Sequence, residues 1–235
     1  MELELNTDPV MFDLVPGDGE IDFLDPFAYA GEYMRYSSLE ITVNGQTYPV
    51  WDYESDELTL WLARLGSGED QITYLYLDAM MENSYHVLSA YELTPDQLIG
   101  VGELSGSNFA GMFTDPSEFV LHTRTEMLST QTGSGIYHID PVSGMPAGEG
   151  YYDLIGELVL TSLVPLEVTV LPDEKKEEIP AGMEFTLLRT DNRTFVDARM
   201  ADGRECRIFV DRSDWPVTID GIPREDCFNG MFFAG

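Results

Sequence analysis

Basic residues are scarce in this sequence. The chain of 235 residues has 12 Lys and Arg against 43 Asp and Glu, which gives a net charge of −31 and a pI near 4.1. Binding to nucleic-acid phosphates or to an anionic membrane surface depends on clustered Lys and Arg, so we expect neither as a partner. A surface this acidic favours cationic partners instead, such as peptide amines, cationic proteins or divalent ions.

Long hydrophobic runs are also missing. No apolar run approaches the ~20 residues that span a bilayer, so we expect no transmembrane segment. The first five residues, Met-Glu-Leu-Glu-Leu, lack the basic and apolar regions of a signal peptide. Frequent Tyr, Thr, Ser, Gly and Asn with only two lysines favour an extracellular or cell-surface protein whose leader is absent from this sequence. A cytosolic protein is the alternative.

Cysteine is limited to Cys206 and Cys227. Two cysteines at this spacing fit no zinc-binding pattern. They either form a disulfide, which typically contributes about 3 kcal/mol, or remain two buried free thiols.

The acidic residues are unevenly distributed. Residues 1–170 hold 29 acids and three bases, whereas residues 171–235 hold 14 acids and nine bases. The shift coincides with a charged stretch between Pro172 and Pro180 that contains both lysines, which is typical of a linker. We therefore predict two domains, residues 1–172 and 173–235. The alternative is that this stretch is a solvated hairpin tip inside one domain.

Hydrophobic residues mostly alternate with a period of two, which predicts an all-β fold. Asn44-Gly45 lies between two alternating runs, the strongest short signal for a hairpin. Many further short strands, separated by Gly and Pro turns, indicate a sandwich or barrel-like domain over residues 1–172. Helix is expected only in short pieces, and a segment from Asp25 through Tyr36 is the longest candidate.

Residues 179–235 resemble the bacterial SH3-like (SH3b-type) domains of cell-envelope proteins. Ile179-Pro-Ala-Gly182 leads into Phe185-Thr-Leu-Leu188, followed by Phe195-Val-Asp197 and a distal-type turn at Asp202-Gly203-Arg204. Glu205-Cys206 stands where the family has Gly-Trp. The resemblance implies a small C-terminal β-barrel that serves as a binding or spacing module, with a cell-wall peptide or glycan as partner. It implies no catalytic activity.

Several aromatic residues are candidates for ligand binding. Trp51, Tyr53 and Trp61 flank an acidic cluster, and the second segment adds Phe195 and Trp215. Exposed aromatic rings beside carboxylates stack on sugars or hold cationic peptides. The alternative is that these rings cover the edges of the core.

Two acidic clusters are candidates for calcium binding. Asp13, Asp18 and Asp22 lie around Gly17 and Gly19, and Asp52 and Asp56 lie in a second cluster. Calcium takes six to eight oxygen ligands, but neither run has EF-hand spacing, so the alternative is two solvated loops. No other cofactor is expected.

Catalytic motifs are absent from the sequence: it has no Gly-x-Ser-x-Gly and no His-Glu-x-x-His. We therefore predict a non-catalytic binding or structural module of a secreted or cell-surface bacterial protein. The alternatives are a calcium-binding surface domain, or a hydrolase that uses a carboxylate pair or a His/Asp cleft within residues 1–172.

One short internal similarity stands out. Phe109-Ala-Gly-Met-Phe113 matches Phe228-Asn-Gly-Met-Phe232 at four of five positions. It marks either a repeated closing element or a coincidence.

Overall fold

The structure, a computed structural model, describes residues 2–4, 10–12, 22–29, 35–43, 45–66, 71–111 and 115–234. Strands make up 60% of it and helix 4%, which confirms the all-β prediction and the expectation of little helix. Within the described part of the chain, no helix has the length and apolar character needed to cross a membrane.

The chain divides into two compact units. The first consists of Met1–Leu121 and Ile136–Ala147, and the second of His122–Gly135 and Gly148–Gly235. Strands β11 (Phe119–Thr125) and β12 (Gln131–Ile139) each contribute residues to both units. The predicted boundary at residue 172 falls inside the second unit.

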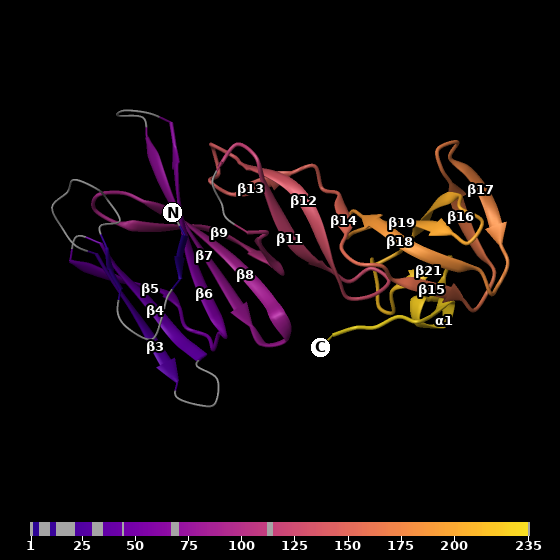
Figure 1. The fold of residues 1–235 in the computed structure, drawn as a ribbon, viewed down its shortest axis with the longest axis horizontal. Coiled ribbons are helices and arrows are strands. Elements are labelled where there is room, and N and C mark those ends of the chain that lie inside the picture. Colours follow the sequence, from indigo (N-terminus) through magenta and orange to yellow (C-terminus); the bar gives the residue numbers. More distant parts are fainter. Residues whose placement is uncertain are drawn as a thin grey trace. The chain divides into compact units, whose positions relative to one another are not determined.

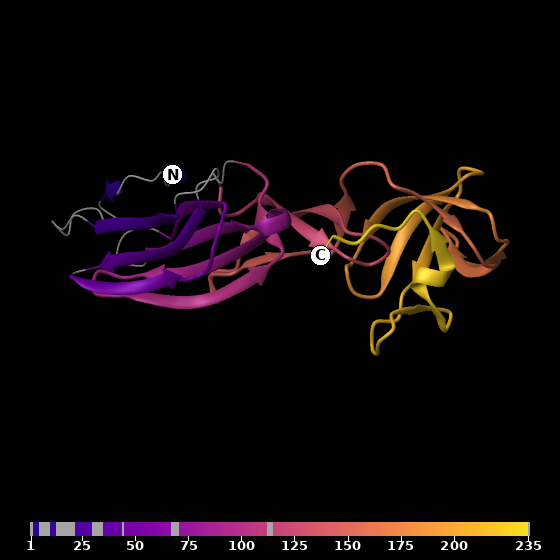
Figure 2. The same cartoon turned by 90° about the horizontal axis from the view of Figure 1, so that it is seen from below.

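The first unit contains two stacked sheets (Figures 1 and 2). One has the order β2-β3-β4-β5 and the other β1-β6-β7-β8-β9, with all pairs antiparallel. Aliphatic side chains from β4 to β7, with Trp51, fill the space between them. The strands are β1 (Glu2–Glu4), β2 (Val10–Phe12), β3 (Asp22–Tyr29), β4 (Arg35–Val43), β5 (Gln46–Trp51), β6 (Glu57–Leu65), β7 (Ile72–Met81), β8 (Tyr85–Leu93) and β9 (Leu98–Ser105), with the 3-10 turn η2 (Glu82–Ser84) between β7 and β8.

The second face of the β6–β9 sheet is buried as well. Trp61, Tyr74 and Tyr76 on this face pack with Phe109 of β10 (Ser107–Phe109) and with Phe119 of β11. Alternation along a strand commonly places one set of side chains on the core and the other in solvent. On these strands both sets are core residues because a layer of strands covers each face of the sheet.

The second unit is built around one core. Strands β18, β19 and β20 form an antiparallel meander, β16 and β17 continue it beyond β20, and β15 joins β18 to β23. Their inward side chains share one cluster that includes Phe185, Val196 and Phe228. The elements of the second unit are β14 (Tyr152–Leu154), β15 (Val159–Ser162), β16 (Leu166–Val170), β17 (Lys175–Ile179), β18 (Glu184–Thr190), β19 (Phe195–Met200), β20 (Glu205–Phe209), β21 (Thr218–Ile219), β22 (Ile222–Pro223), α1 (Arg224–Cys227) and β23 (Phe228–Asn229). Strand β13 (Pro146–Gly148), which pairs with β12, has two of its three residues in the first unit.

Two local predictions are wrong. The segment expected to be a helix from Asp25 to Tyr36 instead supplies β3 and the start of β4, because pairing with neighbouring strands outweighs a weak helical pattern interrupted by Gly31. The charged stretch after Pro172 is not a linker. Lys175–Ile179 pairs residue by residue with Leu166–Val170, as in the hairpin alternative, and its charges suit an edge strand.

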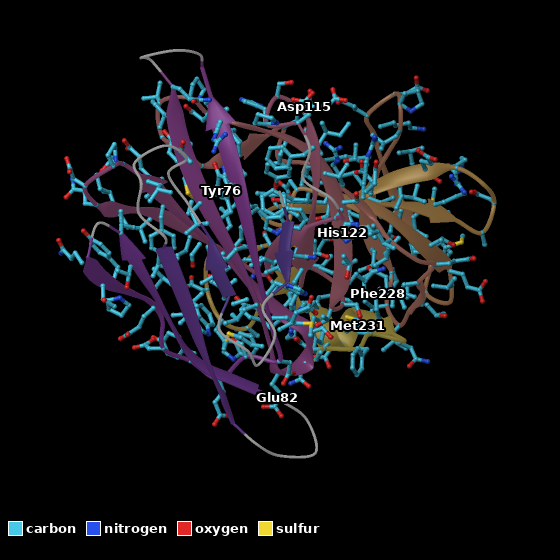
Figure 3. The ribbon with its side chains drawn as sticks, turned by 60° about the vertical axis from the view of Figure 1, so that its left-hand side comes forward. Tyr76, Glu82, Asp115, His122, Phe228 and Met231 are labelled. Carbon is cyan, nitrogen blue, oxygen red and sulfur yellow. The ribbon has the colours of Figure 1, made fainter. Side chains whose placement is uncertain are left out.

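The described part of the first pentad, residues 109–111, has the same local structure as residues 228–230 of the second. Phe109 and Phe228 are both buried in a short strand, and the glycines two residues later, Gly111 and Gly230, both have positive φ (119° and 96°). Met231 packs against the same core as Phe228 (Figure 3). Each pentad therefore places a buried Phe in a strand and then turns the backbone where a glycine is required.

Candidate functional site

Trp215 lies at the tip of a closed loop in the second unit. The backbones of Asp211 and Thr218 exchange two hydrogen bonds of 2.8 and 2.9 Å, which close the loop at its base. The Asp211 carboxylate accepts hydrogen bonds from the hydroxyl and the N–H of Ser213 (2.7 and 2.9 Å), and these bonds lower the pKa of Asp211. The loop holds Trp215 away from the core, with 81% of its surface exposed.

A pocket of about 480 Å³ adjoins this loop. One wall is fixed by Arg224, whose buried guanidinium donates from Nη1 to the carbonyl oxygens of Glu126 (2.7 Å) and Met127 (2.8 Å). Nη1 of Arg212 donates to the carbonyl of Asn192 at 3.1 Å. Backbone carbonyls thus hold both guanidinium groups in place while each keeps its positive charge, and Nε of Arg224 is also paired with Glu225 at 3.0 Å. The lining residues are Glu126, Arg212, Ser213, Asp214, Trp215, Val217 and Arg224.

The pocket lining contains two acids and two arginines, and Asp214 is the acid that stays open to a ligand. Asp214 forms no hydrogen bond or ion pair with any residue that the structure describes. The Glu126 carboxylate is bonded to Arg124 at 2.8 Å and is about half exposed. An exposed indole face beside an unpaired carboxylate suits a cation. The sequence did not point to Glu126, because it reaches the pocket from a hairpin almost 90 residues away in the chain.

The other predicted aromatic residues do not form one platform. Trp51 and Trp61 are only 6% and 3% exposed, so both are core residues, as the alternative reading of these rings expects. Nε1 of Trp51 donates to Oγ of Ser55 at 2.7 Å. Tyr53 is exposed and packs edge-on against Trp51, with ring centroids 5.4 Å apart. Phe195 was expected to be exposed but is buried, because the guanidinium of Arg207 covers its ring at 3.6 Å.

One histidine is paired with a carboxylate in the first unit. Nδ1 of His86 on β8 lies 2.8 Å from Oδ1 of the buried Asp78 on β7. A carboxylate in this position orients an imidazole, as a general base requires. Asp78 is the only hydrogen-bonding or ion-pair partner of the His86 side chain in the described part of the chain, so no described hydroxyl or thiol is bonded to the imidazole.

The calcium prediction remains a prediction. Asp13 and Asp18 lie outside the described residues, and Asp22 lies in β3 with its side chain not described. Among the residues whose side chains the structure describes, which include Asp52 and Asp56, no group of three or more His, Cys, Asp or Glu is arranged to hold a metal ion.

We expect salt to stabilise the chain gradually, because screening weakens repulsion among its acids over a Debye length of about 8 Å at 0.15 M. A specific calcium site adds a further gain of about 2.7 kcal/mol at a hundredfold excess of ion over Kd. Thermal melting in NaCl, and then in Ca²⁺ or Mg²⁺ at matched ionic strength, separates the two effects. A calcium-specific gain that Asp18→Asn removes supports the site, whereas equal gains with both ions contradict it.

The two cysteines are free thiols in the structure. Cys206 and Cys227 are both buried, and Sγ of Cys227 lies 3.4 Å from the carbonyl oxygen of Pro223. The disulfide is not formed, and the alternative of two buried thiols describes the structure. Burial raises the pKa of Cys206 to about 12 and that of Cys227 to about 11.

These thiols should resist alkylation in the native protein. Because the thiolate is the reactive form, both cysteines should stay unlabelled by iodoacetamide at pH 8 and both should react after denaturation in urea without reductant. Mass spectrometry counts the labels. Fewer than two labels in urea would contradict the free thiols.

Comparisons with protein-family models, with curated proteins and with solved structures found no match to this chain. The function therefore has to be argued from the geometry of the site.

Proposed function

We propose that this chain is a non-catalytic binding module of the bacterial cell envelope, and that its second unit binds a cationic segment of a peptide at Trp215. The observation that carries the proposal is the exposed indole on a closed loop beside Asp214, a carboxylate that has no partner among the described residues. A Lys or Arg side chain, or a peptide amine, would lie against the indole face and pair with Asp214.

The envelope setting rests on the resemblance to bacterial SH3-like domains. The strand order of the second unit supports it: β15 pairs with β18 and β23, β18 to β20 form a meander, and α1 directly precedes β23. In such a barrel the loops carry the binding function and the strands hold them in place. Arg224, held by hydrogen bonds to two backbone carbonyls, fixes one wall of the pocket beside the Trp215 loop, in keeping with a rigid scaffold that positions a binding loop.

Tryptophan fluorescence tests the proposed site, because Trp215 is the one exposed tryptophan of three. A peptide with two lysines, acetyl-Lys-Ala-Lys-amide, should change the emission of Trp215 in a saturable way. It should also protect the Trp215 fluorescence from quenching by acrylamide. The glutamate analogue should not. Asp214→Asn should weaken binding of the lysine peptide by about two- to fivefold, as expected for one exposed charge pair.

Binding to insoluble peptidoglycan tests the envelope setting with the same chain. Wild-type protein should co-sediment with peptidoglycan, and acetylation of the free amines of the polymer should abolish this. Trp215→Ala should lose binding, whereas Tyr53→Ala, which removes an exposed ring from the first unit, should retain it. Equal binding by both variants, or no effect of acetylation, would refute the proposal.

A further inference from the structure

A fully buried carboxylate lies between two arginines on the outer face of the β18–β20 sheet. Asp197 of β19 is 1% exposed. Its carboxylate accepts hydrogen bonds from Nε of Arg189 (2.7 Å) and from Nε and Nη2 of Arg207 (2.7 and 3.0 Å). The strand register places these residues opposite one another, with Arg189 and Arg207 on the two neighbours of β19. The group carries one positive charge in excess, in a chain of net charge −31.

The two arginines differ in what remains available to a ligand. Arg207 is held on both sides, because its guanidinium lies over Phe195 and bonds twice to Asp197. Arg189 is 46% exposed and is bonded only through Nε. Its two terminal nitrogens form no hydrogen bond with any residue that the structure describes. Asp197 thus fixes the orientation of Arg189 and leaves its outer N–H groups open.

Arg189 also lines a pocket of about 550 Å³. The hairpin between β16 and β17 contributes Leu171 and Pro172, the turn before β20 contributes Gly203 and Arg204, and the first residue of β20 contributes Glu205. Arg204 is already paired with Glu177 and Asp202, and Glu205 with Arg199. Arg189 is therefore the charged group of this pocket whose terminal N–H groups have no acceptor among the described residues, and Leu171 and Pro172 provide an apolar wall beside it.

From this arrangement we infer that the pocket at Arg189 binds a carboxylate-bearing ligand with a small apolar group next to the carboxylate. A guanidinium presents its terminal N–H groups in the fork that matches the two oxygens of a carboxylate. The surplus positive charge supplies the attraction, and Leu171 and Pro172 receive the apolar group. The site is separate from the pocket at Trp215 and has the opposite charge preference, so either proposal stands without the other.

Two model peptides test the inference on the full chain. Acetyl-Ala-Ala carries a terminal carboxylate, and acetyl-Ala-Ala-amide has the same shape without the charge. In ¹⁵N-labelled protein, the Nε–H signal of Arg189 and the backbone signals of residues 171 and 203–205 should shift in a saturable way with the acid. They should not shift with the amide. Acetyl-Glu-amide tests whether a side-chain carboxylate serves equally well as a terminal one.

The variants separate this role from a structural one. Arg189→Met should weaken binding of acetyl-Ala-Ala at least about tenfold, and Arg189→Lys, which keeps the charge without the fork, should weaken it less. Arg199→Met removes a neighbouring arginine that is paired with Glu205 and should leave binding unchanged. Backbone ¹⁵N–¹H spectra of the free variants that overlap with the wild-type spectrum away from the substituted residue would show that the variants remain folded. Equal binding of acid and amide, no saturable shift with the wild-type chain, or unchanged binding in Arg189→Met would each overturn the inference.

Discussion

Replacing Gly144 with alanine should destabilise the first unit by about 2–5 kcal/mol. Gly144 has φ +70°, a region that costs other residues about 1–2 kcal/mol. A Cβ at this position would lie 2.2 Å from Cε1 of Tyr74, and forcing extra volume into a packed site typically costs about 1–3 kcal/mol. The carbonyl of Gly144 also accepts a 2.7 Å hydrogen bond from the hydroxyl of Tyr76, so its position is fixed.

Gly45 provides a matched control in the same unit. Its φ is +74°, yet no atom lies within 4 Å of an added Cβ, so Gly45→Ala should cost only about 1 kcal/mol. Trp51 and Trp61 are buried in this unit and report its unfolding in urea once Trp215 is replaced by phenylalanine. If the two alanine variants lost the same stability, the packing of Tyr74 against the turn would not matter as we describe.

Local patterns in the sequence identified the strands well. Period-two alternation predicted the all-β fold and is seen directly in β11, where alternate residues from Phe119 to Thr125 are buried, and Asn44-Gly45 predicted the β4–β5 hairpin. Both signals come from neighbouring residues: side chains alternate across a strand, and a tight turn needs positive φ, which Gly45 adopts.

Features that depend on distant segments were not predictable in this way. Alternation cannot show that both faces of β6 and β7 are covered, because the covering layers come from β4 and β5 on one side and from β10 to β12 on the other. Trp61 therefore looked like a candidate for a ligand platform although it is buried. The boundary between the units was missed for the same reason, since the hairpin of β11 and β12 belongs to both.

The candidate sites also depend on contacts between segments that the sequence pattern does not reveal. Trp215 was identified as an aromatic residue, but its pocket is completed by Glu126 from a distant hairpin. The Arg189–Asp197–Arg207 group was not identified, although its three residues lie within 19 positions of one another. Their charges alternate across three neighbouring strands, and this becomes visible only after the register of β18, β19 and β20 is known.

Replacing Arg207 with methionine should destabilise the second unit by about 3–5 kcal/mol. The change removes two of the three side-chain hydrogen bonds to Asp197 and leaves a buried carboxylate with Arg189 alone. Breaking a buried ion pair on one side costs this much because the remaining charge is poorly solvated. The contact of the guanidinium with Phe195 is lost as well. Cys206 and Cys227 lie in the core of this unit, so their rate of alkylation at increasing urea concentration reports its unfolding.

Two further variants distinguish the buried charge from a general effect of losing an arginine. Arg199→Met breaks an exposed pair with Glu205 and should cost less than about 1 kcal/mol. In the double variant Asp197→Val, Arg207→Met, no carboxylate is left buried, so the loss should fall below that of Arg207→Met alone. The coupling between the two positions should then reach about 1–3 kcal/mol, the upper part of the range for residues in direct contact. Strictly additive losses would mean that water reaches Asp197 and that the carboxylate does not depend on Arg207.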